Sequence, residues 1–248
     1  MKKILILSLI IGSLLNAATV TVALAANVSY AIDELKESFY KKHPDTHLRI
    51  IIGGSGKLTA QIKNGAPYDI FMSANLIYPQ RLYKEHFATT EAKVYAYGAL
   101  ALLSQKERDF SQGIAVVTQE SIRYIAVANP KTAPYGTAAI EALKNAKLYK
   151  KIKDKLIYGE SIAQTLSYTM HAADLGFIAK SALYSPKMRS FKEGKNYIEI
   201  DAKLYTPIAQ GVVLLHHADK NKEAKAFYRF ILGKEAKAIF KKYGYSVL

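Results

Sequence analysis

Apolar segments rich in β-branched residues alternate with amphipathic segments along this chain, and this alternation constrains its fold more than any other feature. In the first third of the chain, the segments expected to form strands are residues 19–26, 47–54 and 68–74. The segments expected to form helices are residues 29–42, 57–65 and 79–86. Such alternation is typical of a parallel sheet with helices on both faces, so the sequence predicts an α/β fold.

The same alternation recurs in the rest of the chain. Further strands are expected at residues 97–105, 124–130, 174–181 and 206–217. Further helices are expected at residues 135–146, from about residue 161, and twice within residues 222–245. No segment rich in proline, glycine or serine separates two halves, so two lobes would have to be joined by strands. Two α/β lobes joined in this way describe a hinged binding protein, whose ligand lies in the cleft at the helix N-termini.

The N-terminus has the pattern of a secretory signal peptide. Two lysines precede an apolar run of about a dozen residues, and small residues follow at Ala17 and Ala18. The run is too short for a confident membrane span. We therefore expect residues 1–17 to be removed and the mature chain to be exported to the periplasm.

Composition narrows the possible partners. The chain has no cysteine, which predicts neither a lipid-linked cysteine nor disulfides or thiolate metal ligands. About 230 mature residues suffice for one large or two modest domains. A formal net charge of +15 alone favours nucleic acid, anionic lipid or an anionic small ligand. Because the lysines fall mostly on helix-like segments and the chain is expected to be exported, we interpret the charge as a basic solvated surface and expect no nucleic-acid partner.

The segment IIGGSGKLTAQIKNG, residues 51–65, invites comparison with two known loops. A Walker phosphate loop fails twice, because Ile51 and Leu58 stand where glycine and Ser or Thr are needed. A nucleophile elbow fails because Lys57 replaces its last glycine. A more general anion site remains, since small residues before a helix let backbone N–H groups at the positive helix end approach an anion. A tight turn with no function is the alternative.

The titratable residues indicate no catalytic or metal site. None of the six histidines has the spacing of a histidine metal site. No pair of carboxylates stands out, and Asp33, Glu34 and Asp69 have ordinary uses at helix starts and turns.

Four turns join an expected strand to an expected helix through small or neutral polar residues, and turns from two lobes could converge on one cleft. These residues are Ala26, Asn27 and Ser29, then Gly54 and Ser55, then Tyr135, and finally Ser161 and Ile162. Each has a simpler interpretation. Asn27, Ser29 or Ser161 could cap a helix, and Tyr135 could be a half-buried core ring.

Over nearly the whole mature chain, the sequence resembles the family of periplasmic molybdate-binding proteins, the solute receptors of molybdate ABC importers. The resemblance lies in the order and spacing of LAANVSYAIDEL, GSGKLTAQIKNGAPYDIFMSA, VANPKTAPYGTAAIEAL, DLGFIAKSAL and FKKYGY. It implies a type II, two-lobed periplasmic binding protein fold, each lobe a mixed sheet flanked by helices, with ligand in the inter-lobe cleft. The first lobe would comprise residues 18–95 and 207–248, and the second lobe residues 96–206.

The resemblance also implies a set of neutral donors for a tetrahedral oxyanion. Asn27 would donate through its side chain and backbone N–H, Ser55 through its hydroxyl and N–H, and Tyr135 and Ile162 through backbone N–H groups. Ala26, Gly54 and Ser161 are possible additional contacts. Molybdate or tungstate would be held through its oxygens by these residues, with no cofactor, no resident metal and no catalysis. Lys57 is expected to point to solvent.

One departure concerns a donor that many family members have. They carry a tyrosine on the strand that corresponds to residues 174–181, where this chain has Ala179. The phenol of Tyr135 is one possible replacement.

The resemblance implies that the protein captures molybdate, and we expect tungstate to bind as well. It would act as a monomer that delivers the anion to a membrane permease. Donors without acceptors would select a fully deprotonated dianion. Three alternatives stay open here: the same scaffold for sulfate, phosphate or chromate, an exported α/β hydrolase that uses Ser55 or Ser161, and an adhesive basic surface protein.

Overall fold

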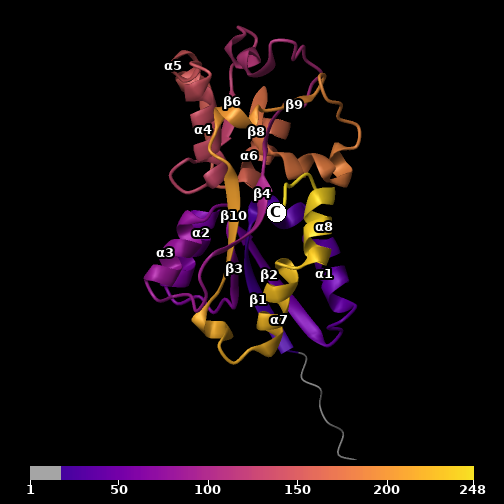
Figure 1. The fold of residues 1–248 in the computed structure, drawn as a ribbon. Coiled ribbons are helices and arrows are strands. Elements are labelled where there is room, and N and C mark those ends of the chain that lie inside the picture. Colours follow the sequence, from indigo (N-terminus) through magenta and orange to yellow (C-terminus); the bar gives the residue numbers. More distant parts are fainter. Residues whose placement is uncertain (1–17) are drawn as a thin grey trace, which may run out of the picture.

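The fold consists of two mixed five-stranded sheets, each flanked by helices, and the chain passes between them through strands (Figure 1). The structure is a computed structural model that describes residues 18–248. The expected signal peptide, residues 1–17, lies outside the described residues. None of the helices in the described part of the chain is both long and apolar enough to cross a membrane.

The first lobe is built on a sheet with the strand order β2-β1-β3-β10-β4. Its strands are β1 (Ala18–Ala25), β2 (Thr46–Gly53), β3 (Ile70–Met72), β4 (Lys93–Gly98) and β10 (Ile208–Leu214). Strands β1, β2 and β3 are parallel, and β10 runs antiparallel to both β3 and β4. Its helices are α1 (Ile32–Tyr40), α2 (Ser55–Lys63), α3 (Ile77–Lys84), α7 (Lys222–Ile231) and α8 (Lys234–Lys242).

Alternation along β1 explains why helices cover both faces of this sheet. Val22 and Leu24 pack with α1, α7 and α8 on one face. Ala23, which lies between them in sequence, packs with α2 and α3 on the other. Successive side chains of a strand point to opposite faces, so a strand buried on both faces is apolar throughout.

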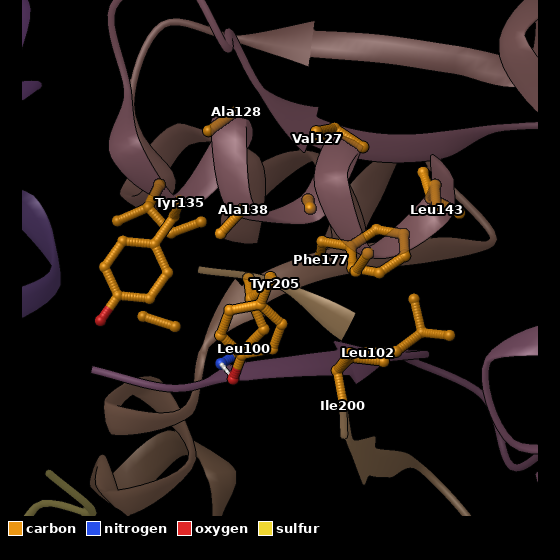
Figure 2. Packing of buried hydrophobic residues seen from close by; sticks show 14 of the residues in the cluster. Leu100, Leu102, Val127, Ala128, Tyr135, Ala138, Leu143, Phe177, Ile200 and Tyr205 are labelled. Carbon is orange, nitrogen blue, oxygen red and sulfur yellow. Dashed lines mark hydrogen bonds between the residues drawn. The ribbon is translucent and has the colours of Figure 1, made fainter. Parts of the chain in front are cut away.

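The second lobe is built on a sheet with the strand order β7-β6-β8-β5-β9. Its strands are β5 (Leu100–Leu103), β6 (Ile125–Ala128), β7 (Leu156–Gly159), β8 (Leu175–Ala179) and β9 (Tyr197–Glu199). Its helices are α4 (Pro134–Asn145), α5 (Tyr149–Ile152) and α6 (Ile162–His171). Figure 2 shows part of this core, in which Ala138 and Leu143 of α4 belong to the same buried cluster as Val127 and Phe177.

The parallel pairing that the alternation predicts is present among β1, β2 and β3 in the first lobe and among β6, β7 and β8 in the second, but each sheet also contains antiparallel strands. Strand β5 is antiparallel to β8 and β9, as β10 is to β3 and β4. These strands pass between the lobes or follow irregular loops, so no helical crossover forces them to run parallel. The mixed sheets that the family resemblance implied are confirmed.

The chain changes sheet at Ala99, between β4 and β5, and returns before β10. The expected lobe boundary at residues 95 and 96 falls inside β4, whose last residues still pair with β10. The assignment of residue ranges to lobes stays a prediction.

Candidate functional site

A small pocket lies where turns from both lobes meet. Its cavity volume is about 10 Å³, and it is lined by Ala25, Ala26, Asn27, Gly53, Gly54, Ser55, Ala74, Ala133, Pro134, Tyr135 and Ile162. The four main candidate residues, Asn27, Ser55, Tyr135 and Ile162, are among them, and so are Ala26 and Gly54. None of the lining side chains is charged, so whatever the pocket holds is met by neutral groups.

Three helices begin at this pocket. Helix α2 starts at Ser55, α4 at Pro134 and α6 at Ile162. The N–H groups in the first turn of a helix have no acceptor within it. The N-terminal ends of α2 and α4 also have no side-chain cap. Backbone donors with partial positive charge therefore converge on one point from both lobes.

Ser55 is buried, and its hydroxyl is set as a donor. The Oγ atom accepts a hydrogen bond from the backbone N–H of Ala74 over 3.0 Å. Because this bond uses an oxygen lone pair, the hydroxyl proton stays available to another acceptor. The side chain is only 1% exposed, so the available acceptor is whatever enters the pocket.

Tyr135 has the same arrangement in the second lobe. Its Oη accepts a hydrogen bond from Gln210 Nε2 over 3.0 Å. Burial raises the pKa of Tyr135 well above its ordinary value, and this keeps the phenol protonated and neutral. Figure 2 shows the ring at one end of the core, with the hydroxyl directed away from Leu143 and Phe177.

Asn27 lies at the start of a 3-10 helix, η1 (Ala26–Tyr30), and is fully buried. Its Nδ2 donates to Gln210 Oε1 over 2.7 Å and to Tyr245 Oη over 2.9 Å. Both amide hydrogens thus have protein acceptors, while Oδ1 has no partner among the described residues. Its carbonyl accepts from the hydroxyls of Ser181 and Tyr245. With both amide hydrogens bound, the backbone N–H is the donor of Asn27 that a ligand could use, while Oδ1 is a free acceptor within residues 18–248.

Ser29, Ser161 and Ala179 were put forward from the sequence and do not line the pocket. The hydroxyl of Ser29 donates to the carbonyl of Ala26 over 2.8 Å. Ser161 caps α6, because its Oγ accepts from the N–H of Gln164 over 3.2 Å. Ala179 is the last residue of β8 and is buried in the second sheet, where it pairs with Leu100.

Lys57 lies at the rim and forms a bridge between the lobes. Its Nζ is 2.9 Å from Glu160 Oε1, and both side chains are about half exposed. Next to it, the N–H of Gly56 donates to the carbonyl of Thr132 over 3.0 Å. These contacts join α2 to two loops of the second lobe, so the pocket lies between lobes that touch.

The pocket lacks the partners of a serine hydrolase. No histidine lines it, and His43, His216 and His217 are bound to Glu223, Asp219 and Asp69 elsewhere. Ser55 Oγ therefore has no general base in the pocket. Within residues 18–248, no group of three or more histidine or acidic side chains is arranged to hold a metal ion.

Three residues that hold the lining side chains in place were not predicted from the sequence, namely Ala74, Gln210 and Tyr245. A signal existed for Gln210, which is the one polar residue inside the apolar strand IAQGVVL. A fully buried glutamine in such a strand needs hydrogen-bond partners. For Ala74 and Tyr245 the sequence offers no comparable signal.

Comparison with known proteins agrees with this geometry. Residues 20–246 match the family model described as bacterial extracellular solute-binding protein. The chain is 35% identical over 236 residues to the molybdate-binding protein ModA of Azotobacter vinelandii, which covers 94% of this chain and 91% of that one. It is 30% identical to a putative ABC transporter substrate-binding lipoprotein, YvgL, of Bacillus subtilis, covering 92% and 86% of the two chains. Among solved structures, the A. vinelandii periplasmic molybdate-binding protein superposes with a TM-score of 0.84 at 32% identity, covering 92% of this chain and 99% of that one.

Proposed function

The chain belongs to the family of bacterial extracellular solute-binding proteins, and from this premise we propose that it captures molybdate and delivers it to an ABC-type membrane permease. The observation that supports this proposal most strongly is that neutral donors from both lobes meet in one pocket, and that no charged side chain lines it. Relatives with the names of molybdate-binding and ABC transporter substrate-binding proteins cover nearly the whole chain. The family binds solutes for transport, and the proposal includes no catalysis.

The proposed donors are the hydroxyls of Ser55 and Tyr135 and the backbone N–H groups of Asn27, Ser55, Tyr135 and Ile162. Ala26 and Gly54 bring the backbone close to the ligand. A hydrogen bond to a charged group contributes about 1.5–3 kcal/mol, so several of them offset the cost of burying a dianion. The three helix ends add a favourable field without an ion pair.

The direction of the hydrogen bonds at the two hydroxyls favours an anion that carries no proton. Ser55 Oγ and Tyr135 Oη each accept an N–H hydrogen bond, and so each presents its own proton to the pocket. Molybdate and tungstate are fully deprotonated near neutral pH, whereas phosphate keeps a proton that needs an acceptor. We therefore include tungstate as a second ligand. In the absence of a tyrosine at Ala179, we assign the missing donor to the hydroxyl of Tyr135.

We further propose that the protein acts as a periplasmic monomer, exported by residues 1–17. The family is extracellular.

Titration calorimetry of the mature protein tests the function. We expect one molybdate per chain with submicromolar affinity. Heat with sulfate but none with molybdate or tungstate would replace the proposal by a different oxyanion receptor. A general esterase assay tests the alternative of a serine hydrolase. Ester turnover that is abolished by Ser55→Ala would show that the protein is a hydrolase and not a molybdate receptor.

A further inference from the structure

We propose that Gln210 is a positioning residue of this site, which holds one pocket residue from each lobe in the orientation that an oxyanion requires. The inference rests on the proposed function. It assigns to Gln210 no direct contact with the ligand, because Gln210 does not line the pocket.

Gln210 lies at the junction of the lobes. It belongs to β10, the strand by which the chain returns to the first lobe (Figure 1). The pairing of β10 with β4 shifts register between Gln210 and Gly211. Such a bulge re-aims a side chain out of the regular alternation of the strand. The amide is fully buried, so its orientation depends on its hydrogen bonds.

The Nε2 atom determines which way the Tyr135 hydroxyl points. It donates to Tyr135 Oη, which belongs to α4 of the second lobe. A hydroxyl that accepts this bond directs its proton away from Gln210. In the part of the chain that the structure describes, Tyr135 Oη has no protein acceptor, so its proton is left for a ligand.

The Oε1 atom orients Asn27 in the first lobe. It accepts from Asn27 Nδ2 over 2.7 Å and from Tyr95 Oη over 3.0 Å. Since Asn27 Oδ1 has no partner among residues 18–248, the amide is held only through Nδ2, by Gln210 and Tyr245. Asn27 in turn fixes the start of η1, where the backbone lines the pocket.

Gly98 makes room for the contact between the lobes. A Cβ atom at this position would overlap both Tyr135 Oη and Gln210 Nε2. A side chain at residue 98 would therefore separate the two groups without touching the ligand.

Phenols are the titratable groups that face this network, namely those of Tyr95, Tyr135, Tyr205 and Tyr245. Burial raises the pKa of each, so the network is neutral near pH 7. No carboxylate, lysine, arginine or histidine among the described residues is hydrogen-bonded to Gln210.

The decisive variant is Gln210→Glu, tested by titration with molybdate at several pH values. A carboxylate only accepts, so Asn27 keeps its partner while Tyr135 must turn its proton towards residue 210. We expect the Kd to rise by roughly tenfold or more at pH 8. We expect it to fall again at lower pH, because burial raises the pKa of the new carboxyl and its protonated form can donate. The wild-type Kd should not change over this pH range.

Asn196→Asp is the matched control. Asn196 is 7% exposed, lies outside the pocket, and accepts from the N–H of Lys192 through Oδ1. The substitution makes the same change from amide to carboxylate, and the Kd of this variant for molybdate should equal that of the wild type. Thermal unfolding reports whether each variant is folded.

One further variant keeps the test decisive if Gln210→Glu does not fold, and a double variant extends the test if it does. Gly98→Ala should weaken molybdate binding by separating Tyr135 from Gln210. In the Tyr135→Phe background, Gln210→Glu should cost much less affinity than in the wild type, since the two changes remove the same donor. Folded Gln210→Glu or Gly98→Ala protein with the wild-type Kd would overturn the inference. A wild-type protein that binds no tetrahedral oxyanion would instead overturn the proposed function, and the inference with it.

Discussion

Replacing Ser55 by alanine separates a role in binding from a role in folding. The hydroxyl accepts from Ala74 N–H in the protein itself, and by our proposal it donates to the anion only in the complex. Ser55→Ala removes both bonds. The first loss should lower the free energy of unfolding, and the second should raise the Kd for molybdate.

The two magnitudes follow from the kinds of bond that are lost. A hydrogen bond to a charged group contributes about 1.5–3 kcal/mol. At about 1.4 kcal/mol per factor of ten, this loss raises the Kd roughly 10- to 150-fold. Leaving the buried N–H of Ala74 without a partner costs about 1–3 kcal/mol of unfolding free energy. Calorimetry measures the first quantity and urea unfolding of the unbound protein measures the second.

Ser104→Ala is the control for Ser55→Ala. Ser104 is equally buried, and its Oγ accepts from Arg108 Nε over 3.0 Å in the second lobe. This variant should lose stability and keep the wild-type Kd. If Ser55→Ala also keeps the wild-type Kd while its stability falls, the reasoning that places Ser55 in the site is refuted.

Four further predictions concern single groups. Tyr135→Phe should weaken molybdate binding in calorimetry, and an unchanged Kd would leave only the backbone N–H of Tyr135 in the site. Lys57→Ala should change the Kd less than about fivefold, because its half-exposed ion pair with Glu160 contributes about 0–1 kcal/mol; a larger loss in the same assay would give the rim a role in closure. The wild-type Kd should stay constant between about pH 6 and 9, because burial raises the pKa of Tyr135 and no carboxyl or imidazole lines the pocket; a titration step in this range would contradict the neutral site. The hydroxyl of Thr46 and then the imidazole of His43 hold the pKa of Glu223 below its ordinary 4.5 in the folded protein. The stability that this carboxylate contributes is therefore present above pH 4.5. It is lost as the pH falls through the lowered pKa of the folded state. Glu223→Gln should therefore flatten the acid side of a plot of unfolding temperature against pH.

Local patterns were sufficient to predict most of the regular elements, although α5, β7 and β9 lie where no element was expected. Helix α2 was expected at residues 57–65 and spans Ser55–Lys63. Gly65 was expected to end it and has a φ of +84°, a conformation that only glycine adopts readily. The position of the helix follows from the spacing of its apolar residues, and its end follows from one glycine. Each of these signals is visible within a few residues of sequence.

Elements at the junction of the lobes were predicted less well. Residues 97–105 were expected to form one strand, but β4 ends at Gly98 and β5 begins at Leu100 in the other sheet. Residues 29–42 were expected to form one helix, but η1 precedes α1 there. Ser29 bonds back to the carbonyl of Ala26 within η1. The carbonyls of Asn27 and Ala99 accept hydrogen bonds from Ser181 and Lys180 of the second lobe, and no local pattern encodes such contacts.

The residues that line the pocket were easier to predict from local sequence than the residues that hold them in place. Small residues at strand ends marked Ala26, Gly54 and Ser55, because close backbone approach leaves a local trace. Gln210 stands out locally only as a polar residue in an apolar strand, and Tyr245 left no local trace. Their bonds to Asn27 span 183 and 218 residues. Predicting them requires the folded arrangement of both lobes.

Neutral donors of both lobes are proposed to hold a molybdate ion in one pocket. Crystals of the mature protein grown with molybdate and measured at the molybdenum absorption edge would locate the ion. We expect a single strong anomalous peak, with oxygens in hydrogen-bond distance of Ser55 Oγ and of the backbone N–H of Ile162. A peak at a different place on the protein, or no peak under conditions where sulfate occupies the pocket, would contradict this proposal.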